Sequence, residues 1–142
     1  MKHLLLPILL LTLVSCREPA SVERFLAGKG PFVYQVDMRD STHTYQLDFY
    51  SRVDGEAPAS AELFIQWTSP SGQVYTENAW LPLQGRRSPF SREVFHPYRA
   101  GLSPYEAGVW TLSVSIPSAQ LIPGFRGLGL VVAKTEAWDT EN

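Results

Sequence analysis

The sequence predicts an all-β protein, an antiparallel β-sandwich of about seven strands with an immunoglobulin-like or jelly-roll-like arrangement. Three observations support this fold class. Apolar and polar residues alternate with period two over residues 45–50, residues 61–80 have the pattern of a β-hairpin, and proline and glycine separate many short segments. Because no segment has a convincing amphipathic-helix pattern, we expect two sheets that pack over a shared core.

The N-terminal segment has the pattern of a lipoprotein signal peptide. A short charged start precedes an apolar run over residues 4–14, which is shorter than the roughly 20 apolar residues that a bilayer-spanning helix needs. The run ends at Ser15 and Cys16, and residues 13–16 resemble the bacterial lipobox. We therefore expect cleavage between Ser15 and Cys16, removal of residues 1–15, and attachment of a diacylglyceryl thioether and an N-acyl chain to Cys16.

Lipidation of Cys16 has consequences for stability and location. It is the only cysteine, so no intramolecular disulfide is expected and the core alone must stabilise the fold. Several acyl chains together hold a protein firmly to a membrane, since each buried CH₂ contributes about 0.8 kcal/mol. Arg17 is not the aspartate that retains lipoproteins in the inner membrane of some Gram-negative bacteria, which favours the outer membrane. A free cysteine near an ordinary cleavage site is the alternative interpretation.

The mature chain has the length of one domain. We expect residues 16–30 to form the lipidated cysteine and a polar tether, residues 31–135 the β-sandwich, and residues 136–142 an acidic tail. Ser21 is also a candidate cap for a single helical turn ending at Leu26. With 12 basic and 14 acidic residues, the charge balance gives no reason to expect nucleic acid as a partner.

The hairpin has the clearest local signal among the expected strands. Pro70 and Gly72 occupy the second and fourth positions of a four-residue turn, which are the preferences of a type I turn. A long loop that includes one short strand is expected over residues 81–103. The expected strands are residues 32–39, 45–50, 61–68, 73–80, 91–95, 109–116 and 128–133.

Residue patterns for catalysis are missing. After the signal the only histidines are His43 and His96, both expected at the surface, and no serine has the glycine-flanked pattern of a nucleophile elbow. No cluster of His, Asp or Glu has metal-ligand spacing. We therefore predict a protein that is not an enzyme and holds no cofactor or metal. A hydrolase with dispersed carboxylates is a minor alternative, because such carboxylates come together only in three dimensions.

The long loop is the first candidate for partner binding. It combines arginines with aromatic residues, both of which are enriched where proteins meet proteins. The alternative is an ordinary solvated loop. The candidate residues are Arg86, Arg87, Phe90, Arg92, Phe95, Tyr98 and Arg99.

The four tryptophans suggest a second kind of site. Trp67 and Trp110 lie on alternating apolar faces and are expected in the core. Trp80 and Trp138 are freer to be exposed and are candidates for binding a glycan. A surface glycan-binding lipoprotein is therefore the alternative to a protein-binding one.

The order of these motifs resembles that of the small gliding-motility-associated lipoproteins of the GldH type found in Bacteroidota. The resemblance begins with the lipobox and continues through the strand at residues 45–49, residues 63–65 with the turn at 69–72, residues 108–114 and residues 124–130. It implies a non-enzymatic, membrane-anchored accessory component of the gliding and secretion apparatus. The expected partners are the membrane, through the lipid anchor, and other envelope proteins.

Overall fold

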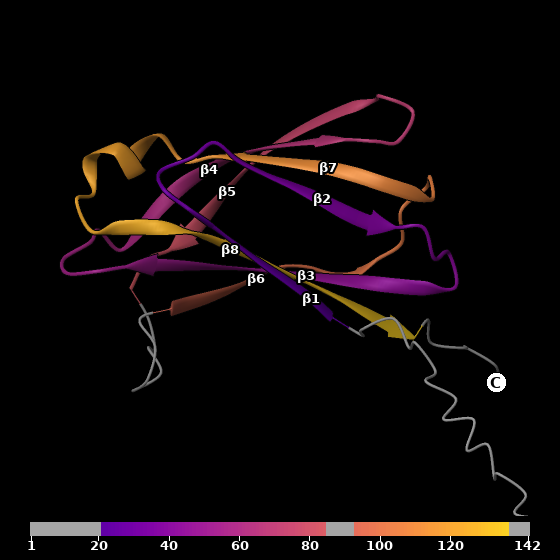
Figure 1. The fold of residues 1–142 in the computed structure, drawn as a ribbon, viewed down its shortest axis with the longest axis horizontal. Helices are drawn as coiled ribbons and strands as arrows, with labels where there is room; N and C mark the ends of the chain where they lie inside the picture. Colours follow the sequence, from indigo (N-terminus) through magenta and orange to yellow (C-terminus); the bar gives the residue numbers. More distant parts are fainter. Residues whose placement is uncertain (1–20, 85–92, 137–142) are drawn as a thin grey trace, which may run out of the picture.

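The computed structural model describes residues 21–84 and 93–136, which form a β-sandwich (Figure 1). No helix in these two ranges is long and apolar enough to cross a membrane. The elements are β1 (Ser21–Ala27), β2 (Phe32–Met38), β3 (His43–Val53), β4 (Ser60–Thr68), β5 (Val74–Pro82), β6 (Glu93–Leu102), β7 (Gly108–Ser115), the 3₁₀-helix η1 (Pro117–Leu121) and β8 (Phe125–Glu136).

The predicted fold class is confirmed, and the strand order specifies its topology. The first sheet has the order β1-β8-β3-β6 and the second has the order β2-β7-β4-β5, with antiparallel pairing throughout. Strands pair as β1 with β8, β2 with β7, β3 with β6 and β4 with β5, as in a long hairpin rolled into two layers. This is the jelly-roll arrangement. The edge strands β1 and β2 therefore lie on one side of the sandwich, and β5 and β6 lie on the other.

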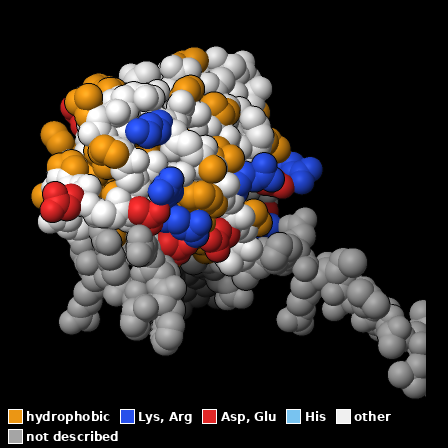
Figure 2. Space-filling model, turned by 60° about the vertical axis from the view of Figure 1, so that its left-hand side comes forward, with side chains coloured by type: hydrophobic (Ala, Val, Ile, Leu, Met, Phe, Trp, Pro, Cys, Tyr) orange, Lys and Arg blue, Asp and Glu red, His pale blue; other side chains and the backbone are white. Residues whose placement is uncertain are grey.

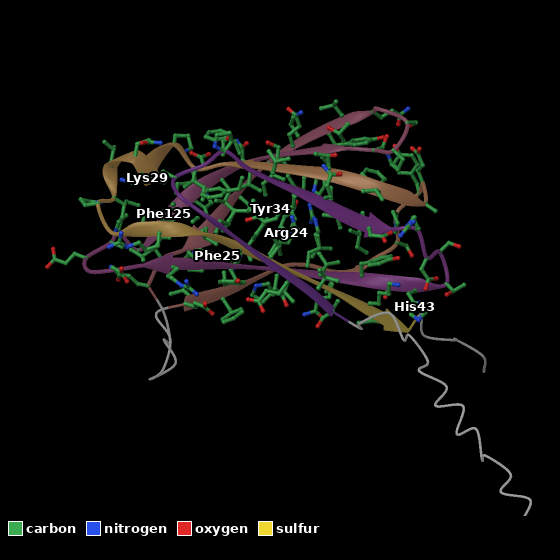
Figure 3. The ribbon with its side chains drawn as sticks, viewed as in Figure 1. Arg24, Phe25, Lys29, Tyr34, His43 and Phe125 are labelled. Atoms are coloured by element: carbon green, nitrogen blue, oxygen red, sulfur yellow. The ribbon has the colours of Figure 1, made fainter. Side chains whose placement is uncertain are left out.

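The core lies between the two sheets, as the alternation predicts. Residues of β2 alternate strictly between buried and exposed, and Tyr45, Leu47 and Phe49 of β3 are fully buried. Tyr34 crosses the core from the second sheet (Figure 3), and its hydroxyl donates a hydrogen bond of 2.6 Å to the carbonyl oxygen of Leu128 in the first sheet. This bond satisfies a hydroxyl that would otherwise be buried at a cost.

The predicted hairpin is also confirmed. β4 and β5 pair in unbroken register from Ser60 with Pro82 to Thr68 with Val74. At the turn, the Gly72 amide donates to the carbonyl oxygen of Ser69 at 2.9 Å. The hairpin was predictable because the residues that determine it lie next to each other in the sequence.

The predicted tether and helical turn are wrong for residues 21–27, which form the edge strand β1. Its residues pair with β8 from Ser21 with Ala133 to Ala27 with Gly127. Most side chains of β1 are exposed, so the segment has a polar composition although its backbone belongs to a sheet. The sandwich therefore includes residues 21–27, which lie before its predicted start at residue 31.

The boundaries of several other strands also differ from the prediction, those of β6 and β8 among them. β6 covers ten residues where a short strand over residues 91–95 was expected, and β8 extends beyond residues 128–133 in both directions. Pro97 suggested a loop, but β6 is an edge strand that pairs with β3 alone among the described strands, and proline is tolerated at such an edge. The described part of the chain thus has eight strands rather than about seven.

Candidate functional site

A groove of about 340 Å³ opens between the edge strands β5 and β6. We call it the edge groove. Side chains of β5 form one wall, side chains of β6 and the following loop form the other, and Trp67 and Trp110 contribute aromatic surface from the second sheet. Its lining residues are Met38, Trp67, Tyr75, Thr76, Glu77, Arg99, Leu102, Ser103, Pro104, Tyr105 and Trp110.

The register of the hairpin explains why aromatic rings gather there. Trp67 lies opposite Tyr75, and Ile65 lies opposite Glu77. Directly paired residues point to the same side of a sheet, and Ile65 is buried in the core. Tyr75 and Glu77 therefore also face the space between the sheets, at the edge where that space is open.

Both indole groups are held by hydrogen bonds. The Trp110 Nε1 donates to the carbonyl oxygen of Glu106 at 2.9 Å, and the Trp67 Nε1 donates to the Tyr98 hydroxyl at 3.0 Å. The two indole rings meet edge to face, with 6.2 Å between their centroids, and the Trp67 ring is nearly parallel to that of Tyr98. These contacts fix the rings, so the groove is formed before any ligand arrives.

The outer rim of the groove carries two tyrosine hydroxyls. The Tyr75 hydroxyl donates to the Tyr105 hydroxyl at 2.9 Å, and the Tyr105 hydroxyl donates to the Gln73 Oε1 at 2.7 Å. The Gln73 Oε1 also lies 2.8 Å from the Tyr75 hydroxyl oxygen. The hydrogen bond to Tyr105 and partial burial raise the pKa of Tyr75 above its ordinary value. The Tyr75 hydroxyl is therefore a neutral group at physiological pH.

The polar part of the groove wall is the Glu77 carboxylate, whose negative charge is balanced by a neighbouring cation. Glu77 accepts hydrogen bonds from the Tyr98 hydroxyl and from the Arg99 guanidinium. The guanidinium carbon of Arg99 also lies 5.1 Å from the centre of the Tyr98 ring. Because the negative charge of Glu77 already has a cationic partner, the wall does not call for a charged ligand.

This arrangement is suited to binding a flat or apolar group. Rings offer stacking surfaces, hydroxyls offer hydrogen bonds, and the volume lies near the lower end of the range of about 300–1,000 Å³ for small-ligand pockets. Within residues 21–84 and 93–136, no group of three or more His, Cys, Asp or Glu side chains is arranged to hold a metal.

The predicted arginine-rich binding surface is divided by the structure. Phe95 is exposed on the outer face of the first sheet, 5.2 Å from the Tyr50 ring, whereas Tyr98 points inward and packs 4.9 Å from Phe49. Of the predicted set, Arg99 lines the edge groove. The other members, Arg86, Arg87, Phe90 and Arg92, lie outside the described residues.

Charges of both signs lie side by side at the end of the sandwich where β3 ends and β6 begins. Figure 2 shows Lys and Arg side chains next to Asp and Glu side chains on this face. Arg52 pairs with Glu93 at 2.5 Å, and Arg126 pairs with Asp54 at 2.7 Å. The described part of this face therefore does not form a single-sign patch for a highly charged partner.

The tryptophan predictions are partly confirmed. Trp110 is buried, as expected, but Trp67 is only half-buried and faces the edge groove. Trp80 is 62% exposed on the outer face of the second sheet, close to Phe64, which is 44% exposed. Trp138, Ser15 and Cys16 lie outside the described residues, so their predicted roles stay predictions.

Sequence reasoning identified Arg99 as a binding residue but missed most of the other groove residues, including Tyr75, Glu77 and Tyr105. The predicted four-residue turn alone would pair Trp67 with Val74. Gly72 has a positive φ and adds one residue to the turn, so the Ser69 amide donates to the carbonyl oxygen of Gln73 and Trp67 pairs with Tyr75. Tyr105 lies in the loop between β6 and β7, and nothing local in the sequence places that loop beside β5.

Fold and groove together define the class of this protein: a jelly-roll β-sandwich with an open aromatic groove between two edge strands. Comparisons with known proteins assign it to no family. No family model matches the chain, and no curated protein or solved structure is significantly similar to it.

Proposed function

We propose that this protein is a lipid-anchored, non-enzymatic accessory subunit of a cell-envelope assembly of the gliding-motility or secretion type. In this proposal the edge groove binds the partner. The observation that carries the proposal is the open groove, whose fixed aromatic rings and arginine are residue types that dominate the energetics of protein interfaces. The lipobox at Cys16 and the resemblance to the gliding-associated lipoproteins support the envelope location.

The position of β1 supports a partner close to the membrane. Ser21 follows Cys16 by five residues, so an anchored chain can hold the start of β1 no further than about 18 Å from the lipid attachment. Ser21 pairs with Ala133, which pairs with Gln46 near the start of β3. In Figures 1 and 3 this start, marked by His43, lies at the same end of the sandwich as the end of β2.

The edge groove lies at that end too. Met38, the last residue of β2, lines it, and so does Leu102, the last residue of β6, which pairs with Tyr45. An anchored sandwich thus has its groove at the end nearest the lipid. A partner that is itself embedded in or attached to the same membrane fits this placement.

Site-specific photocrosslinking in the native envelope tests the proposal. A photoreactive amino acid replaces Tyr105, which is 64% exposed at the groove, and in a matched control it replaces Leu121, which is 84% exposed in η1. We expect crosslinks to envelope proteins from position 105 and far fewer from position 121. The Cys16→Ala form should lose both membrane fractionation and these crosslinks. Equal crosslinking from both positions would contradict binding at the groove.

Glycan binding is a second candidate, favoured by the exposure of Trp80. Phe64 lies opposite Asn78 and Trp80 lies opposite Glu62, so the two aromatic side chains occupy diagonally adjacent outward positions. The neighbouring outward positions are largely uncharged and polar: Gln66, Thr76, Asn78, Ser113 and Ser115. Aromatic rings among hydrogen-bonding groups suit a sugar polymer.

Calorimetric titration with a panel of envelope polysaccharides tests this second candidate. Binding that is lost in Trp80→Ala and retained in Tyr105→Ala would establish a glycan site on the outer face of the second sheet. Absence of heat with every polysaccharide would remove the candidate and leave the edge groove as the binding site.

A further inference from the structure

We infer that the partner binds as an extended peptide segment, which adds to the free edge of β5 and places an uncharged apolar side chain in the edge groove. This inference rests on the proposed function and specifies the chemistry of the partner. The segment is a strand of another protein with aliphatic or aromatic residues at alternate positions.

The edge of β5 is available for strand addition. β5 is the last strand of the second sheet and pairs only with β4 among the described residues. Its nine residues keep one register with β4 throughout. The backbone N–H and C=O groups on the other side of such a strand form a template for a further strand.

The other three edges are less suitable. β6 contains Pro97 and has register irregularities opposite β3, both of which interrupt a ladder. β1 and β2 are shorter, with seven residues each, and β1 carries the adjacent charges of Glu23 and Arg24. β5 has one charged residue, Glu77, and this carboxylate already accepts hydrogen bonds from Tyr98 and Arg99. Proteins protect edges with proline, irregularity and charge. The one proline of β5, Pro82, is the last residue of the strand, so Val74–Leu81 stay free of proline, and β5 is two residues longer than β2.

The groove adjoins this edge directly. Tyr75, Thr76 and Glu77 belong to β5 and also line the groove. An added strand would lie about 4.8 Å from β5, and every second side chain would point to the side of Tyr75 and Glu77. Those side chains would enter the space toward Arg99 and Leu102 of β6. One extended segment can therefore use the backbone edge for affinity and the groove for specificity, the mode by which peptides augment sheets.

The lining determines which side chain fits. Met38, Trp67, Leu102 and Trp110 provide apolar surface. A charged side chain would have to compete with the existing ion pair between Glu77 and Arg99. On the outer face the neighbouring β5 residues Thr76 and Asn78 are uncharged. The preferred segment is thus an uncharged β-strand former with an aliphatic or aromatic residue for the groove.

A selection from displayed random peptides of nine residues, the length of β5, tests the inference. The target is the full lipidated chain in detergent micelles. Enriched peptides are resynthesised with a methyl group on one backbone nitrogen at a time, and their affinities are measured. We expect methylation at alternate positions to weaken binding about tenfold, the effect of losing one well-made hydrogen bond, and methylation between them to have little effect.

Two variants locate the bound peptide. Tyr75→Ala should weaken binding about tenfold or more, because it removes a wall of the groove at the β5 edge. Val33→Ala, an exposed position on the edge strand β2, is the matched control and should bind as the unmodified protein does. Thermal unfolding curves of both variants establish that they are folded.

Three outcomes would overturn the inference. The first is that the unmodified protein enriches no peptide that the Tyr75→Ala variant does not also enrich, and the second is that methylation at consecutive positions weakens peptide binding equally. The third is dimerisation of the full chain through position 105 in the crosslinking experiment. The last outcome would make a second copy the occupant of this edge. Crosslinks from position 105 to another envelope protein would still support the proposed function when peptides fail to bind, so the two proposals fail separately.

Discussion

Two aromatic clusters outside the main core have similar compositions, but one is buried and the other is open to solvent. On the outer face of the first sheet, Tyr50 contacts Phe25 of β1 and Phe95 of β6, with centroid distances of 6.0 Å and 5.2 Å, and is only 1% exposed. In the edge groove, Tyr75 and Tyr105 stay open to solvent. The difference is the set of neighbouring side chains. Phe25 of β1 and Phe95 of β6, from strands of the same sheet, lie against the Tyr50 ring, whereas no described side chain closes off the outer side of Tyr75 and Tyr105. Aromatic content alone therefore does not predict a binding site.

Glycines in β8 make the closed cluster possible. Gly129 lies opposite Tyr50 in β3, and a Cβ added there would overlap the Tyr50 ring. The Tyr50 hydroxyl reaches across to β1, where it donates to the Glu23 Oε1 at 2.5 Å. Arg52 completes the cluster, with its guanidinium carbon 4.5 Å from the centre of the Phe25 ring. The glycines of β8 thus serve the packing of the Tyr50 cluster rather than ligand binding.

The largest expected effect is on stability, in the closed cluster. Tyr50→Ala should lower the free energy of unfolding by about 3–5 kcal/mol, the cost of truncating a fully buried aromatic side chain. Urea unfolding monitored by tryptophan fluorescence measures this change. A loss below about 1 kcal/mol would mean that β1 does not hold the ring in place, and the contrast between the two clusters would disappear.

Gly129→Ala should cost less, about 1–3 kcal/mol, because the added methyl group forces the Tyr50 ring to move. The same substitution in the Tyr50→Ala background should cost clearly less, since the overlap is then gone. A double-mutant cycle from urea unfolding measures the coupling. Purely additive costs would show that Gly129 is needed for its backbone rather than for the space above it.

Alkaline pH should lower the stability of the fold through its buried tyrosines. Burial raises the pKa of Tyr34 and of Tyr50 well above the ordinary value of 10.0. Above pH 10 the unfolded chain therefore loses these protons while the native state keeps them, so stability is fully present below pH 10 and falls as the pH rises. Each such tyrosine contributes a slope of about 1.4 kcal/mol per pH unit. Tyr34→Phe should reduce the slope of unfolding free energy against pH by one such contribution. An unchanged slope would contradict the burial of this hydroxyl.

How much was predictable depended on whether the determining contacts are local. The alternation of Tyr45, Leu47 and Phe49 was correctly interpreted because the core covers one entire face of β3. The same alternation places Tyr50 on the outer face, where Phe25 of β1 buries its ring, and β1 joins this sheet only by pairing with β8 at the other end of the chain. Because of Pro97 the full length of β6 was not predicted. Proline is tolerated in a strand at the edge of a sheet, and the edge position of β6 is known only from the assembled sheet.

The candidate site shows the same division. The register of the hairpin gives the Trp67–Tyr75 pair, so one wall of the groove follows from residues that are close in the sequence. Arg99 and Tyr105 reach the groove only because β6 and β7 belong to different sheets. The lipid anchor at Cys16 rests on the motif alone, since it lies outside the described residues.

The smallest expected effect is at the rim of the open cluster. Tyr105→Phe should change the free energy of unfolding by no more than about 0.5 kcal/mol, as is usual for exposed positions. The hydrogen bond with Tyr105 is the largest cause of the raised pKa of Tyr75, so its removal should lower that pKa toward 10.0. NMR titration of the Tyr75 ring measures the change. A lowered pKa with unchanged stability would mean that Tyr105 tunes the rim without supporting the fold, as a binding surface requires. A large loss of stability would instead place Tyr105 with Tyr50, as a packing residue.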